Sequence, residues 1–148
     1  MNKIMNKILA KNKEGISKAA IDFFSFGHLL GGYFAFIILD AFYLVILGEF
    51  VIEICIVTVF LCGVIWEIVE NTYLFNKNVK FGYRRDSLLN SSMDVVMLTM
   101  GGFFASYCLE LNLETFLIVS ALFFIGNILL MSIYANKIIE LFSGLSKK

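Results

Sequence analysis

The stretch FVIEICIVTVFLCGVIWEIVENTY, residues 50–73, is a long apolar segment that ends in acidic and amide side chains. A helix needs about 20 mainly apolar residues to cross a bilayer, and this stretch has that length. The chain holds three further stretches of the same character, at about 23–40, 92–109 and 115–134. We therefore predict an all-α integral membrane bundle of four transmembrane helices, built as a single polytopic domain over residues 1–148.

The composition supports a membrane protein. The 148 residues are 59% hydrophobic and 16% charged, with a mean hydropathy of +0.84. Soluble domains are about 45–50% apolar and about 25% charged, so the apolar excess must face lipid. The formal net charge is zero, which gives no basic field to attract nucleic acid. The three cysteines lie in apolar runs without a CxxC spacing, so no disulfide framework or zinc knuckle is expected.

The ends of the spans are less well defined by the sequence. Residues 41–48 are apolar too, so the first span ends somewhere between 38 and 48. Before it, apolar residues recur at roughly helical spacing among lysines, at Ile4, Met5, Ile8, Leu9 and Ile16. This pattern predicts a short basic N-terminal helix on the membrane interface; a frayed basic tail is the alternative. No apolar stretch in this segment is long enough for a secretory signal peptide. The residues after Tyr134 are expected to form a short amphipathic or disordered end.

Lysine and arginine lie in three places: before the first span, between the second and third, and after the fourth. An even number of spans brings these three places to one side of the membrane. The opposite loops carry Asp40, Glu49, Glu110 and Glu114 and no basic residue. Because basic loops stay on the cytoplasmic side, we expect a multi-pass protein of the cell membrane with both termini and the central loop cytoplasmic.

Polar side chains inside the spans all fall near that same side. A charged residue within a transmembrane helix costs at least about 2.5–3.5 kcal/mol and needs a partner. Spacings of three and four residues place each helix's set on one face, so neighbouring helices could bring the sets together. The residues of this predicted polar site are His28 in the first span, Glu67, Glu70 and Asn71 in the second, and Asp86, Asn90 and Asp94 at the start of the third.

An imidazole among several carboxylates suits a divalent metal such as magnesium, manganese or zinc. The candidate metal ligands are His28, Glu67, Glu70 and Asp94. The candidate catalytic residues, as metal ligands or general base, are Glu67, Glu70, Asp86 and Asp94. The candidate residues for binding a lipid head group are Asn71, Tyr83, Arg84, Arg85 and Asn90. For Arg84 and Arg85, a role as topology signals and interface anchors is the alternative.

The run WEIVEN at residues 66–71, the run DSLLNSSMD at residues 86–94 and Gly101 together resemble an uncharacterised family of small bacterial membrane proteins with WExxEN and DSxxNSxxD motifs. FGHLLGG at residues 26–32 is similar to that family's histidine-bearing motif, and the whole is distantly similar to VanZ-type proteins. The resemblance implies a site at the seven residues of the predicted polar site. The chain departs from the pattern at Gly31, where a second histidine is expected, and at Arg85, where a glycine is expected.

The resemblance implies no reaction, because that family has no established activity and VanZ-type proteins are known through glycopeptide-antibiotic resistance. Three functions stay open. The polar residues could form a structural network in an envelope-related protein, a metal-assisted enzyme acting on phospholipid or polyprenyl-phosphate head groups, or an ion or proton carrier. Membrane lipid is the expected partner and nucleic acid is not. The sequence also allows a homo-oligomer.

Overall fold

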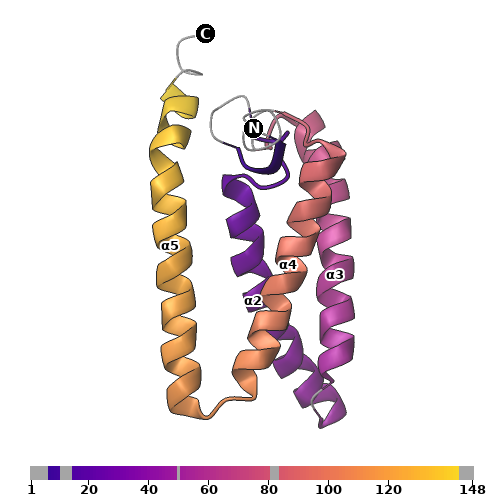
Figure 1. Ribbon diagram of the computed structural model, residues 1–148. Helices are drawn as coiled ribbons and strands as arrows, with labels where there is room; N and C mark the ends of the chain where they lie inside the picture. Colours follow the sequence, from indigo (N-terminus) through magenta and orange to yellow (C-terminus); the bar gives the residue numbers. More distant parts are fainter. Residues whose placement is uncertain (1–6, 11–14, 50, 81–83, 144–148) are drawn as a thin grey trace.

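The computed structural model describes residues 7–10, 15–49, 51–80 and 84–143, with side chains up to Ser132 in the last helix (Figure 1). Its long helices are α2 (Phe23–Leu47), α3 (Ile52–Val69), α4 (Leu88–Leu109) and α5 (Leu113–Ser143). A π-helical segment, η1 (Glu70–Leu74), continues α3. Four helices in the described chain are long and apolar enough to cross a membrane, which confirms the predicted all-α bundle of four spans.

Local capping explains where the helices begin and end. Asp22 caps α2, and Ser25 returns a bond to the Asp22 backbone in a capping box. Gly48, with φ of 76°, closes that helix, so the first span includes residues 41–47. Ser87 caps α4, so this helix begins at Leu88, four residues before the predicted start at residue 92. The helix α5 continues to Ser143, beyond the predicted end at 134.

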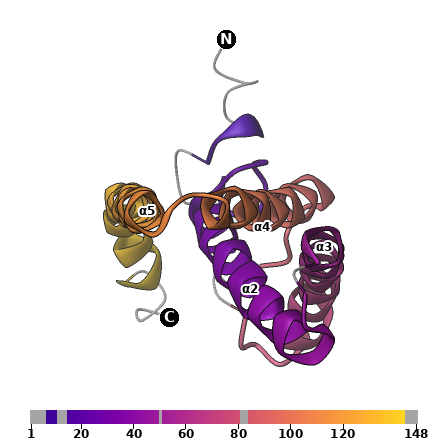
Figure 2. The same ribbon diagram turned by 90° about the horizontal axis from the view of Figure 1, so that it is seen from below.

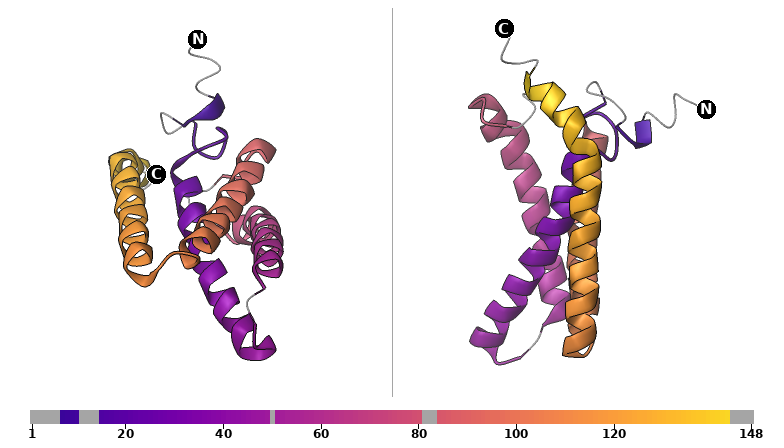
Figure 3. Two further views of the ribbon diagram at one scale, coloured as in Figure 1. Left: turned by 60° about the horizontal axis from the view of Figure 1, so that its bottom comes forward. Right: turned by 90° about the vertical axis from the view of Figure 1, so that its left-hand side faces the viewer.

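The helices alternate in direction, so their ends form two groups. The start of α2, the end of α3 with η1, the start of α4 and the end of α5 lie at one end of the bundle (Figures 1 and 3). We call this the basic end, because Lys18, Lys77 and Lys80 lie there. The opposite, acidic end carries Glu49 and Glu110. This is the same-side arrangement that four spans require.

The helices α2 and α4 form the closest pair, and Figure 2 shows α3 and α5 on opposite sides of it. A Cβ on Gly32 would lie 1.7 Å from the backbone oxygen of Leu98, and a Cβ on Gly101 would lie 2.0 Å from that of Leu29. Small residues of this kind let two helix backbones approach in a membrane. The two glycines therefore set the distance between α2 and α4.

An aromatic cluster joins α5 to this pair. The Tyr33 ring of α2 stacks on Phe123 with centroids 5.2 Å apart, and Phe104 of α4 stacks on Phe123 at 4.5 Å. The Tyr33 hydroxyl also shares a hydrogen bond of 2.6 Å with Ser120. The fourth span thus attaches in the middle of the bundle, away from the predicted polar site.

The described part of the N-terminal segment folds against the start of α2. Leu9 pairs with Ile21 in an isolated bridge, and the Ala10 amide donates to the Ile21 carbonyl at 2.9 Å. Ala10 and Ile16 are buried. The sequence predicted that Ile16 lies on the apolar face of a surface helix. This prediction is wrong for Ile16, which lies in a turn and is buried. The predicted helical positions Ile4 and Met5 lie outside the described residues.

Replacing Gly101 by alanine should separate α2 from α4, because the new methyl group would overlap the Leu29 carbonyl. We expect a loss of about 1–3 kcal/mol in stability, seen as a lower melting temperature in detergent. Gly126→Ala is the matched control, since a Cβ there meets nothing within 4 Å. The control should be neutral or stabilising by up to about 1 kcal/mol through helix propensity. Equal melting temperatures for the two variants would contradict this packing.

Candidate functional site at the basic end

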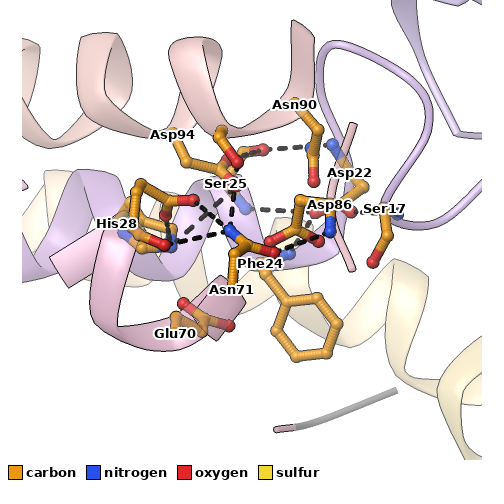
Figure 4. Close-up of polar contacts among 12 residues, drawn as sticks. Ser17, Asp22, Phe24, Ser25, His28, Glu70, Asn71, Asp86, Asn90 and Asp94 are labelled. Carbon is orange, nitrogen blue, oxygen red and sulfur yellow. Dashed lines mark hydrogen bonds and ion pairs between the residues drawn. The ribbon is translucent and has the colours of Figure 1, made fainter. Parts of the chain in front are cut away.

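Three ionisable side chains from three helices meet at the basic end. His28 Nε2 of α2 lies 3.5 Å from Glu67 Oε1 of α3 and 4.0 Å from Asp94 Oδ2 of α4. One ligand atom from each residue lies within 4.8 Å of the other two. Glu67 and Asp94 are buried, and the His28 side chain is 13% exposed. We call His28, Glu67 and Asp94 the central triad; Figure 4 shows the imidazole beside Asp94.

Ser25 orients Asp94 within the triad. The Ser25 hydroxyl accepts the Asp22 amide at 3.1 Å and donates to Asp94 Oδ1 at 2.5 Å (Figure 4). The other oxygen of Asp94 is the one that lies near His28. Asp22 is held in turn by the Ser17 amide, which donates to Asp22 Oδ2 at 2.9 Å. The cap of α2 therefore also positions a carboxylate of α4.

Asn71 in η1 connects the triad to the loop before α4. Its amide nitrogen donates at 3.1 Å to Glu67 Oε2 and, at the same distance, to Ser91 Oγ. Its oxygen accepts from the Asp86 amide and from Lys80 Nζ, both at 2.7 Å. π-Helical turns are rare and frequent at functional sites. Here the π-turn carries the side chain that contacts α3, α4 and the loop together.

Lys80 neutralises part of the acidic cluster. Its side chain is 2% exposed, and its ammonium group contacts Asp86 directly and lies 3.7 Å from Glu70 Oε1. Sequence reasoning counted Lys80 as a topology signal and missed this contact. The sequence feature that could have indicated this contact is the position of Lys80, six residues before Asp86 in the loop between η1 and α4. Sequence reasoning also missed Asp22, Ser25 and Ser91, because common hydroxyl and cap residues carry no distinctive pattern.

Glu67 is the exceptional group in the cluster. Its Oε1 is buried and has no hydrogen-bond partner among the described residues, although Oε2 is bonded to Asn71. Buried carboxylate oxygens normally accept hydrogen bonds, whereas the polar atom that faces this one is His28 Nε2 at 3.5 Å. Four carboxylates lie near one lysine and one histidine here. Burial and mutual repulsion disfavour the ionised forms of such a group, and either a proton or a further cation offsets the excess negative charge.

The other predicted residues lie around this centre. Asp86 precedes α4 and faces Lys80, so it does not continue a helical stripe with Asp94. Asn90 turns away and donates to the Ala20 carbonyl at 3.4 Å. Arg85 is exposed, lies 4.7 Å from the Phe75 ring centroid and donates to Asn76 at 3.3 Å. Arg84 is also exposed. Tyr83 lies outside the described residues.

Two grooves flank the central triad. The larger, of about 620 Å³, runs between α3 and α4 and is lined at its polar end by Glu67, Asn71, Asp86 and Ser91. The smaller, of about 360 Å³, is lined by His28, Trp66 and Glu70 among others. The triad thus lies between two surfaces from which a small group could reach it.

Comparison with known proteins places the chain in a family. The family described as "Protein of unknown function (DUF2585)" matches residues 4–142, nearly the whole sequence. The chain belongs to this family. Neither the comparison with curated proteins nor that with solved structures gives a match. The prediction of an uncharacterised family is therefore confirmed, and all the residues of the central triad lie within the matched region.

Replacing Lys80 by methionine should destabilise the protein, because Asp86 and Glu70 would lose a buried cation. Breaking a buried ion pair by removing one partner costs about 3–5 kcal/mol. Lys77→Met, at an exposed lysine of the same loop, is the control and should change stability by less than about 0.5 kcal/mol. Thermal unfolding in detergent measures both. A Lys80 variant as stable as the control would refute the pairing.

Proposed function

We propose that this protein is a metal-dependent membrane enzyme that acts on phosphate-bearing lipid head groups. The observation that carries the proposal is the buried Oε1 of Glu67, which accepts no hydrogen bond among the described residues and faces His28 Nε2 at 3.5 Å inside the central triad. One imidazole and two carboxylates form a common donor set for divalent metals. Three protein ligands leave coordination positions for water or substrate, as catalytic metal sites require. Zinc, manganese and magnesium are the candidate ions.

The surrounding residues receive roles from their contacts. Asp86 lines the α3–α4 groove, and we assign it the part of general base, with Lys80 orienting it. Glu70 positions Lys80, and Asn71 fixes Glu67 and the backbone of Asp86. A bound metal would polarise a phosphoryl oxygen of the substrate. Glu70, predicted as a metal ligand, is thus proposed to act through the lysine.

The location of the site fits a head-group substrate. It lies at the basic end, which we propose is cytoplasmic because lysine and arginine collect there. Arg84 and Arg85 are exposed at that end and can meet lipid phosphates. The protein is accordingly proposed to reside in the cell membrane with both termini in the cytoplasm. We also propose the distant similarity to VanZ-type proteins, which is consistent with an envelope function.

A structural network is the second candidate. The bonds from Asp22 through Ser25 to Asp94 join α2 to α4, and those of Asn71 join α3 to α4. Such bonds would hold the helices in register without any reaction. For a carrier, the polar groups described away from the basic end do not form a continuous path. Asp40, expected in a loop of the acidic end, instead lies buried inside α2, and its Oδ1 accepts no hydrogen bond among the described residues. Thr58 bonds within its own helix, and Ser120 bonds to Tyr33.

Metal titration separates the two candidates. Protein stripped with chelator should bind one divalent ion per chain, and Glu67→Gln combined with Asp94→Asn should weaken binding at least about 100-fold. Glu53→Gln with Glu114→Gln is the control, because both residues are exposed at the acidic end. Calorimetry with Zn²⁺, Mn²⁺ and Mg²⁺ measures affinity. Saturating metal should also raise the melting temperature of the wild type and control.

Different outcomes support the structural network and the metal-dependent enzyme. If Asp94→Ala lowers the melting temperature while neither it nor the wild type shows a metal-dependent shift, the network is structural. If the metal binds through the triad, metal-loaded protein should release head groups from phospholipid vesicles, and the double variant should not. Lipid mass spectrometry of the vesicles detects the products. Equal metal affinity in the wild type and the double variant would refute the proposed site.

A further inference from the structure

The groove between α3 and α4 has a lining that changes from polar to apolar along its length. Its end at the basic side is formed by Asn71, Thr72, Asp86, Ser91 and Ser92. Leu88 also lines that end, and Glu67 lies where the lining changes. Toward the middle of the bundle the lining is aliphatic and aromatic. These are Phe60, Val64, Ile68, Val95 and Val96.

The length of the groove matches one leaflet of a bilayer. From Phe60 to Asn71 the helix rises about 16 Å at 1.5 Å per residue. The hydrocarbon core of a bilayer is about 30 Å thick, so one leaflet supplies about half of that. The polar end of the groove therefore lies at head-group level when its apolar end lies near the bilayer midplane. Its volume of about 620 Å³ is within the range of small-molecule sites.

The groove is accessible from the side of the bundle. Ile68 is 58% exposed and Val96 is 47% exposed on its two walls. In a membrane these walls face lipid, so a lipid molecule needs no passage through water to reach them. At the polar end lies Glu67, whose other oxygen belongs to the central triad.

We propose that this groove binds one acyl chain of a membrane phospholipid and thereby places the head group against Ser91 and Ser92, beside the central triad. The inference rests on the proposed function and specifies its substrate class as a phospholipid that arrives laterally from the bilayer. The polar end supplies the hydroxyl groups of Ser91 and Ser92 for the head-group oxygens, because the Asn71 amide already donates to Glu67 and Ser91. The apolar walls hold the chain and so align the head group with the metal ligands.

The test compares two isoleucines of α3. Ile68→Trp fills the groove, whereas Ile65→Trp adds the same bulk at a residue that is 60% exposed and does not line it. Delipidated protein in detergent is titrated with dioleoyl phosphatidylethanolamine, and bound lipid is counted by native mass spectrometry. We expect one tightly bound lipid in the wild type and in Ile65→Trp. Ile68→Trp should bind about tenfold more weakly, because several methylene groups lose their contacts.

A second variant and a competitor without acyl chains complete the test. Val96→Trp, on the opposite wall, should repeat the loss if Ile68→Trp fails to fold. Soluble glycerophosphoethanolamine, which lacks chains, should not compete. The proposal is overturned if both isoleucine variants bind lipid equally, if the chain-free head group binds as tightly, or if a second copy of the protein occupies the groove as a dimer. Metal affinity is measured on the same samples: Ile68→Trp should retain it, whereas Asp94→Asn, at a triad residue that does not line the groove, should lose metal and retain lipid.

Discussion

The close approach of α2 and α4 governs the rest of the structure. Gly32 and Gly101 let the backbones touch where any side chain would overlap a carbonyl oxygen. Because no hydrophobic effect drives helices together in lipid, such packing contacts decide which helices pair. At the basic end, this contact brings Ser25 and His28 of α2 next to Asp94 of α4. The central triad therefore depends on two residues that have no polar group of their own.

The third helix completes the site through its irregular end. If α3 continued as a regular helix, residues 67, 70 and 71 would follow the α-helical periodicity. The π-helical segment Glu70–Leu74 interrupts that periodicity, and its Asn71 contacts both the triad and the returning loop. Lys80 then places a positive charge among the carboxylates. Lys80 offsets one of the four negative charges, and Glu67 Oε1, which faces His28, accepts no hydrogen bond among the described residues.

Much of the site could be predicted from the sequence because depth in the membrane is linear along each span. His28, Glu67 and Asp94 were expected at one level, and they do meet there. Which residues at that level would touch could not be predicted. Asn90 has the helical spacing of Asp94, yet it bonds to Ala20 because the N-terminal segment folds over that part of α4. Lys80 looked like a topology signal, because a loop lysine carries no mark of burial.

The amino-acid sequence by itself determined the number of spans, their alternation and the end at which polar groups collect. Those features follow from the length of apolar runs and from the positions of charges, which are local properties of the chain. Tertiary structure alone decided the pairing of α2 with α4, the contacts of Lys80 and the groove between α3 and α4. These depend on how helix surfaces fit together, and many pairings satisfy the same hydropathy pattern.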